Sequence, residues 1–249
     1  MHFSRTVLLI LLAGTSWSIQ AAEITVSAAA SLKDAFSEIA KDYQKKYPNS
    51  SIKLNTAASG ILLQQLLQGA PVDVLATADE ATMSKAIEKK AIDAASRKTF
   101  ARNTLVLVQP KDSKMRVKNL QDLTQEKIDR IAMGNPASVP AGNYAKAALE
   151  KQGLFASIQP KLVYSQNVRQ ALDYVTRGEV DAGFVYRTDA ILQADKLNIV
   201  ATVPTTTPVS YPIGIVSNSK HQTEAKRFVD YILSAQGQTV LKKYGFSKP

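Results

Sequence analysis

The chain alternates between strand-like and helix-like segments along most of its length, and this alternation limits the folds open to it. The short apolar run "EITVSAA" carries the β-branched residues typical of a strand. Behind it, apolar residues from Leu32 to Tyr47 recur at helical spacing. The same succession returns several times further along the chain. A repeated β–α order predicts an α/β protein whose sheets are mixed, mostly parallel and flanked by helices.

Extended segments near residues 102–106 and 208–216 divide this succession into two series. We therefore predict two lobes that are joined by paired crossings of the chain. The first lobe comprises residues 23–103 and a return segment, residues 210–249, which ends in a last helix over 221–235. The second lobe comprises residues 104–209.

The N-terminal stretch has the pattern of a secretory signal peptide. Arg5 precedes the short apolar run "TVLLILLAG", and small residues follow near Ala21 and Ala22. The run is shorter than the roughly 20 residues that a membrane-spanning helix needs. We expect residues 1–22 to be cleaved and the mature protein to be soluble and periplasmic.

Composition excludes several classes of site. The chain has no Cys and only two His, so it can form neither a disulfide framework nor a thiolate metal site. Without the signal peptide, 30 Lys and Arg face 21 Asp and Glu, a net charge of +9. These charges are scattered and form no basic cluster with aromatic residues, so we expect no nucleic-acid partner.

Enzyme motifs are also missing from the sequence. It contains no nucleophile elbow of the G-x-S-x-G type, no phosphate loop with Lys and no dinucleotide fingerprint. The carboxylates are spread out, and we expect Asp73 and Asp181 to serve the structure or the surface. We therefore predict that the protein is not an enzyme and needs no cofactor.

A recurring feature of the sequence is a strand end that leads directly into a helix start. Taken singly, such a residue is usually a helix cap or a packing residue, and Ser31 with Asp34 comes close to a capping box. Taken together, the junctions are more informative, because helix N-termini gather at the carboxyl ends of the strands in such sheets. The five junction residues are Ser31, Ser59, Ala141, Val168 and Tyr186.

These five positions would form a ring of neutral hydrogen-bond donors. Two Ser hydroxyls and one Tyr hydroxyl would act with backbone amides at positive helix ends. Such a ring suits an oxyanion that is fully deprotonated and accepts at each oxygen. A protonated phosphate would instead require an acceptor in the site.

Several longer motifs, in this order and spacing, resemble the periplasmic molybdate-binding proteins of ABC transporters. They are "AAASL", "GAPVDVLATAD", "VPAGNYAKAAL", "NVRQAL" and "VYRTDA". The resemblance spans nearly the whole mature chain and implies a two-lobed periplasmic-binding-protein fold of type 2. It also implies that molybdate or tungstate is held between the lobes by hydrogen bonds alone, with no protein ligand to the metal itself.

Carried over residue by residue, the resemblance assigns ligand donors to the same five junctions. Ser31 and Ser59 match hydroxyl and amide donors of the first lobe, Ala141 and Val168 match backbone donors of the second, and Tyr186 matches a hydroxyl donor. The family further implies a monomer that delivers its oxyanion to the permease and ATPase of an importer. A binding protein for sulfate or another tetrahedral oxyanion is the nearest alternative, and an enzyme on the same fold is a more distant one.

Overall fold

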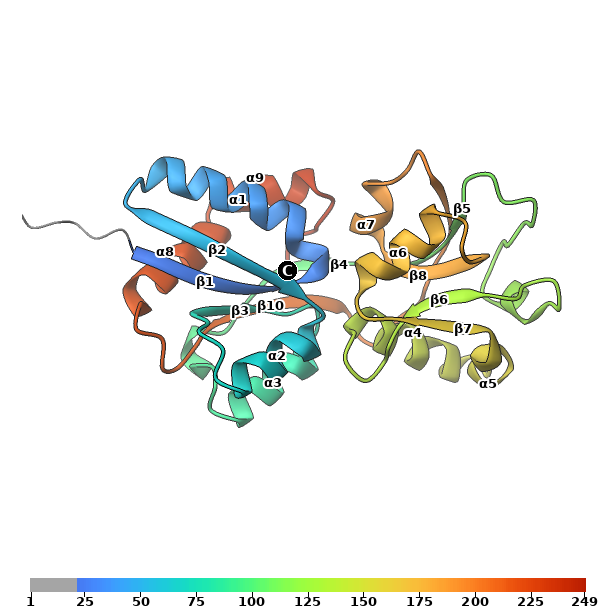
Figure 1. Cartoon of the computed structure of the whole chain (residues 1–249), viewed down its shortest axis with the longest axis horizontal. Coiled ribbons are helices and arrows are strands. Elements are labelled where there is room, and N and C mark those ends of the chain that lie inside the picture. The colour runs from blue at the N-terminus through green and yellow to red at the C-terminus, as the bar shows by residue number, and fades with distance from the viewer. Residues whose placement is uncertain (1–21) are drawn as a thin grey trace, which may run out of the picture.

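Two lobes lie side by side in the computed structural model, which describes residues 22–249 (Figure 1). Each lobe is built on its own five-stranded sheet. The predicted α/β fold with two lobes is therefore confirmed. The predicted signal peptide, residues 1–22, lies outside the described residues except for Ala22. Within residues 22–249, no helix has the length and apolar character that a membrane crossing requires.

The sheet of the first lobe is mixed, and only one of its strands runs against the other four. Its strands, in spatial order, are β2 (Ser50–Ala57), β1 (Ala22–Ala29), β3 (Val74–Ala76), β10 (Val209–Ile215) and β4 (Lys98–Asn103). The first three strands pair in parallel, and β10 pairs antiparallel with both β3 and β4. The reversed strand is thus the one by which the chain returns from the second lobe.

The sheet of the second lobe repeats this plan. Its strands, in spatial order, are β7 (Leu162–Ser165), β6 (Ile131–Gly134), β8 (Ala182–Tyr186), β5 (Leu105–Pro110) and β9 (Leu197–Thr202). Strands β7, β6 and β8 are parallel, and β5 pairs antiparallel with β8 and β9. Here too the reversed strand is the one that enters from the other lobe.

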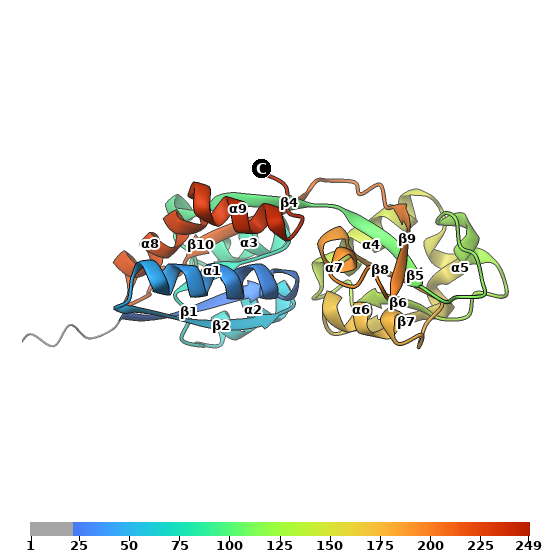
Figure 2. The same cartoon turned by 90° about the horizontal axis from the view of Figure 1, so that it is seen from above.

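Helices cover both faces of each sheet (Figures 1 and 2). In the first lobe these helices are α1 (Lys33–Lys46), α2 (Ser59–Leu67), α3 (Glu80–Glu88), α8 (Gln222–Leu233) and α9 (Ala235–Lys243). In the second lobe they are α4 (Pro140–Lys151), α5 (Phe155–Ile158), α6 (Val168–Thr176) and α7 (Arg187–Ile191). Helix α1 packs with α8 and α9, and α2 packs with α3, so the first-lobe sheet has a core on each side.

Aromatic side chains fill the core beneath α1 and α8. The ring of Phe36 lies 5.6 Å from that of Phe100 and 6.5 Å from that of Phe228, measured between centroids. Tyr43 meets Phe228 edge to face at 5.2 Å. Such offset and edge-to-face contacts add to the free energy gained by burial alone. They fix helix α1 and, with it, the turn that precedes it at the lobe boundary.

Two segments of chain connect the lobes, and they run close together (Figure 2). The first passes from β4 to β5 through Thr104, and the second passes from β9 to β10 through residues 203–208. At their ends they pair, because Val209 lies opposite Asn103 and the amide of Val203 donates to the carbonyl of Leu105 at 2.9 Å. Paired extended crossings of this kind can serve as a hinge between two rigid bodies.

Two local predictions were wrong. The last helix does not run over 221–235 but ends at Leu233, and a further helix, α9, follows. Ser234 explains the interruption, because its extended backbone breaks the first helix while its hydroxyl accepts from the amide of Gly237. The capping box of Ser31 and Asp34 is not formed either. Ser31 lies inside a 3-10 turn, Ala30–Leu32, whose start has no side-chain cap.

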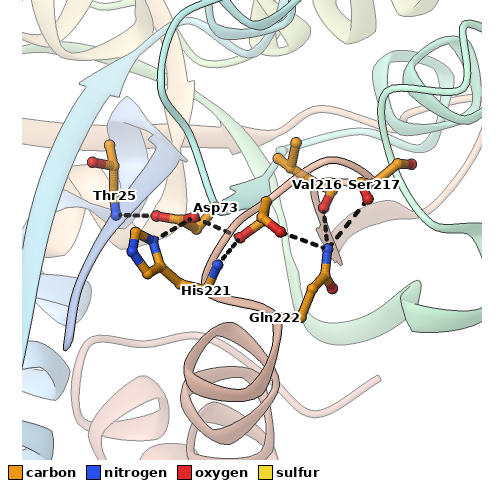
Figure 3. A network of polar contacts seen from close by, with 7 residues as sticks. Thr25, Asp73, Val216, Ser217, His221 and Gln222 are labelled. Carbon is orange, nitrogen blue, oxygen red and sulfur yellow. Dashed lines mark hydrogen bonds and ion pairs between the residues drawn. The ribbon is translucent and has the colours of Figure 1, made fainter.

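A polar network surrounds Asp73 at the amino-terminal end of β3 (Figure 3). The carboxylate accepts from the amide of Thr25 at 2.8 Å and from the hydroxyl of Ser219 at 2.6 Å, and Nδ1 of His221 lies 3.2 Å away. Nearby, the side-chain amide of Gln222 donates to the carbonyl of Val216 at 2.9 Å. The network ties β1 to the chain that precedes α8, which agrees with a structural role for Asp73.

Replacing Asp73 with Ala should lower the free energy of unfolding by about 2–3 kcal/mol. The reason is that the change leaves the Thr25 amide and the Ser219 hydroxyl without their charged acceptor. Urea denaturation followed by circular dichroism would measure the change, with the exposed Asp195→Ala as the control. Equal stability of the two variants would contradict a structural role for the network.

Candidate functional site

Strand register places the two predicted serines at the same edge of the first-lobe sheet. Ala29 of β1 lies opposite Ala57 of β2, and Ser31 and Ser59 each follow two residues later. The Ser59 hydroxyl accepts from the amide of Ala78 at 3.0 Å, so its own proton is available to a further acceptor. Ser59 is the first residue of α2 and not its cap.

The predicted positions of the second lobe also lie at helix starts. Ala141 directly follows Pro140, the first residue of α4, and Val168 is the first residue of α6. The side chain of Asn167 caps α6 by accepting from the amides of Arg169 and Gln170 rather than from that of Val168. Because the first amides of a helix have no partner within it, the Val168 amide can act as a donor to a ligand.

A close approach of backbone to backbone seats α4 on its sheet. A Cβ atom on Gly142 would lie only 1.8 Å from the carbonyl oxygen of Gly134 in β6. No other residue type would therefore allow this spacing. The approach brings the N-terminus of α4, which carries Ala141, directly against the carboxyl end of β6.

All five predicted residues are buried. The exposed fractions of these residues lie between 0% for Ser59 and Ala141 and 4% for Val168. Between the lobes there is also a groove of about 840 Å³, lined by residues of both lobes, among them Asp79 and Tyr144, but by none of the five. A ligand held by these five positions could therefore enter only when the lobes move apart.

The hydroxyl of Tyr186 is a buried polar group for which residues 22–249 provide no partner. Tyr186 is the last residue of β8 and precedes α7, and it is only 1% exposed. Among the residues that the structure describes, none accepts from or donates to its hydroxyl. Burial raises the pKa of Tyr186 well above its usual value, so the hydroxyl keeps its proton and remains a donor. Buried hydroxyls almost always have a partner, which points to a ligand at this position.

Tyr211 of β10 connects the two lobes beside the ring of Tyr186, and no pattern in the sequence had indicated this role. Its hydroxyl lies 2.9 Å from that of Ser31, and its ring lies 5.9 Å from the ring of Tyr186. The side-chain amide of Asn103, at the first crossing, donates to the Tyr211 hydroxyl at 3.2 Å and to the hydroxyl of Thr188 at 2.9 Å. Residues of both lobes and of the hinge thus meet at one point.

The guanidinium of Arg169 lies beside this region and pairs with two carboxylates. Nη2 of Arg169 lies 2.7 Å from a carboxylate oxygen of Asp34, and its Nε lies 2.6 Å from one of Asp189. Asp189 is fully buried. Burial raises the pKa of Asp189 to about 6, and the attraction of Arg169 opposes this rise. The oxygens of another buried carboxylate, Asp79, are engaged by the amide and hydroxyl of Thr82.

Neither a metal centre nor a catalytic triad emerges from these side chains. Within residues 22–249, no three His, Cys, Asp or Glu residues are grouped so that they could hold a metal ion. Asp73, Ser219 and His221 are the residue types of a catalytic triad, but their hydrogen bonds do not connect them as a triad requires. Ser219 donates to Asp73, whereas a serine nucleophile requires a histidine as its acceptor.

The lobes touch where α2 begins. The amide of Gly60 donates to the carbonyl of Ser138, in the loop between β6 and α4, at 3.0 Å. A Cβ atom on Gly60 would lie 2.8 Å from that oxygen and 2.9 Å from the Ser138 Cα. The amide of Gly60 is therefore used to hold the lobes together, and the absence of a side chain is what permits this approach.

Replacing Gly60 with Ala should keep the lobes further apart without weakening either of them. Within a helix, Ala is more stable than Gly by roughly 0.5–1 kcal/mol, whereas the added methyl collides with Ser138 only when the lobes meet. Small-angle X-ray scattering should therefore show a larger radius of gyration than for the wild type, and thermal unfolding should show no loss of stability. A radius equal to that of the exposed-helix control Ser84→Ala would contradict this account.

Comparisons with known proteins agree with the two-lobed fold. A model of the family described as bacterial extracellular solute-binding protein matches residues 24–247. The molybdate-binding protein ModA of Escherichia coli (strain K12) is 38% identical over 231 residues, which covers 90% of this chain and 89% of that protein.

Two solved structures share the fold at lower sequence identity. The periplasmic molybdate-binding protein of Azotobacter vinelandii has a TM-score of 0.79 at 24% identity, covering 91% of this chain and 99% of that one. The sulfate-binding protein SubI of Mycobacterium tuberculosis H37Rv has a TM-score of 0.78 at 17% identity, covering 91% of this chain and 87% of that one. These nearly equal scores mean that fold alone does not choose between the two anions.

Proposed function

This chain belongs to the family of bacterial extracellular solute-binding proteins, and on that premise we propose that it binds molybdate between its two lobes. The relatives that support this ligand are molybdate-binding proteins, among them the one from Escherichia coli that is similar along nearly the whole chain. In the proposed site, Ser31, Ser59 and Tyr186 donate through hydroxyls. Ala141 and Val168 donate through backbone amides.

The observation that carries this proposal is the buried hydroxyl of Tyr186, which has no hydrogen-bond partner among residues 22–249. A hydroxyl left without a partner in the interior costs about 1–3 kcal/mol, which an acceptor oxygen of the ligand would recover. Tyr186 comes from the second lobe, and its ring packs against Tyr211, whose hydroxyl contacts Ser31 of the first lobe. These contacts support a ligand position near the Tyr186 hydroxyl that would link the two lobes.

Neutral hydrogen-bond donors, rather than a free cation, would hold the oxyanion in the proposed site. Arg169 is already paired with Asp34 and Asp189. Stabilisation of a dianion therefore depends on neutral donors that the fold holds in place, which a low-dielectric interior makes effective. Asp79 is buried, and each of its carboxylate oxygens already accepts one hydrogen bond from Thr82.

Sulfate is the strongest alternative ligand, because it is also a tetrahedral dianion and the fold is shared with a sulfate-binding protein. Molybdate and sulfate present the same pattern of acceptors and differ in size. Selection between them must therefore come from the dimensions of the site, and tungstate, which is close to molybdate in size, should bind as well.

The remaining parts of the proposal follow from membership in this family. The protein would be exported by its signal peptide, act in the periplasm as a monomer and present its ligand to the permease and ATPase of an ABC importer. Closure of the lobes would signal to the importer that the site is occupied. The ligand would leave chemically unchanged, without any cofactor.

Calorimetric titration of the purified mature protein tests the ligand. We expect one molybdate or tungstate per protein, with sulfate and phosphate binding far more weakly. Tight binding of sulfate instead would support an oxyanion site but would identify sulfate, and not molybdate, as the ligand. The absence of heat with all four anions would overturn the proposed function.

Replacing Tyr186 with Phe tests the site itself. Losing a hydrogen bond to a charged ligand costs about 1.5–3 kcal/mol, so molybdate binding should weaken roughly 10- to 100-fold. Tyr164→Phe is the matched control, because Tyr164 lies in β7 and is 45% exposed. Ser59→Ala should weaken binding in the same direction. Unchanged affinity in both Tyr186→Phe and Ser59→Ala would refute the assignment of these donors.

A further inference from the structure

Arg169 joins two parts of the chain that belong to different lobes. It is the second residue of α6 in the second lobe, directly after Val168. Its Nη2 reaches across to Asp34, in the first turn of α1 in the first lobe, at 2.7 Å. Its Nε lies 2.6 Å from Asp189 of α7, within its own lobe. One guanidinium group thus pairs with both lobes at once.

The two ion pairs differ in their surroundings. Asp189 is fully buried, and the side chains of Arg169 and Asp34 are 22% and 40% exposed. A buried carboxylate without a partner would be strongly destabilising, so the pair with Asp189 must persist whether the lobes are open or closed. The pair with Asp34 can exist only while the lobes are in contact, since α1 and α6 are carried by different sheets.

Both partners of the pair between the lobes are joined to segments of the proposed site. Asp34 follows Ser31 by three residues, and the turn that contains Ser31 packs against α6. Arg169 is the direct neighbour of Val168, whose amide is a proposed donor. An attraction between Arg169 and Asp34 therefore draws one ligand-bearing segment of each lobe toward the other.

From this arrangement we propose that Arg169 is a positioning residue that holds the lobes closed through Asp34 and thereby sets how slowly the ligand is released. The inference rests on the proposed function, because release is meaningful only if a ligand is bound between the lobes. Arg169 does not touch the ligand in this account. It contributes to affinity only through the closed state, which it favours over the open one.

The chemistry of Arg explains why this residue type suits the role. The planar guanidinium spreads its charge over three nitrogens, so Nε can lie beside Asp189 while Nη2 lies beside Asp34 of the other lobe. Asp189 thus holds the group ready in the open state, and closure loses little side-chain entropy. The ammonium group of Lys is a single point charge on a flexible stem and could not serve both carboxylates in this geometry.

The test uses Asp34→Asn, which keeps the shape of the side chain and removes its charge. Wild-type protein is first titrated with molybdate, and a failure to bind there would count against the proposed function alone. We then expect Asp34→Asn to bind about two- to fivefold more weakly, the range for a partly exposed ion pair. The loss should appear as faster release of molybdate, and the ligand-free variant should unfold at the same temperature as the wild type.

Asp42→Asn is the matched control, because Asp42 lies on the same helix and pairs with the exposed Lys45. It should bind and release molybdate like the wild type. High salt supplies a second readout, since screening should weaken wild-type binding more than binding by Asp34→Asn. If Asp34→Asn matches the wild type in affinity, release rate and salt dependence, the inference is wrong.

A double-mutant cycle of Arg169→Lys and Asp34→Asn separates an effect on lobe closure from an effect on the stability of the fold. The effects of Arg169→Lys and Asp34→Asn on molybdate affinity should be non-additive, because each change removes the same contact. Their effects on the unfolding of the ligand-free protein should be additive, since the lobes need not touch in that state. Additive effects on affinity would overturn the proposal even if both single variants bind weakly.

Discussion

The parallel pairing of β1 with β2 and of β6 with β7 decides where the functional groups of this protein can lie. Parallel strands end at a common edge, so the residues that follow them are brought together although they are far apart in sequence. Register places Ser31 and Ser59 at equivalent positions after Ala29 and Ala57. The pairing of the strands therefore sets the location of the proposed site, and the residues that follow the strand ends provide its hydrogen-bond donors.

The reversed strands β5 and β10 add the second constraint. Each enters its sheet from the other lobe, so the two connections lie next to each other and leave the remaining boundary free to open. Two of the contacts across that boundary have specific requirements. The backbone hydrogen bond from Gly60 to Ser138 requires the absence of a side chain, and the ion pair of Arg169 with Asp34 requires two opposite charges. Closure thus depends on short-range contacts that a ligand can help to form.

Local patterns in the sequence predict much of this fold, and the contacts between the lobes are what they miss. Strand and helix periodicity, with Pro140 and Gly153 marking helix ends, identified most elements. The break between α8 and α9 at Ser234 was not predicted, because the apolar pattern hardly changes between these two helices. The contact of Ser31 with Tyr211 joins residues 180 positions apart, and no local signal in the sequence announces such a pair.

A crystal structure of the protein grown with molybdate tests the central claim most directly, because molybdenum can be located by its anomalous scattering. The account predicts one strong peak between the lobes, within hydrogen-bonding reach of the hydroxyls of Ser31, Ser59 and Tyr186 and of the amides of Ala141 and Val168. A peak elsewhere, or one that contacts only a single lobe, would contradict it.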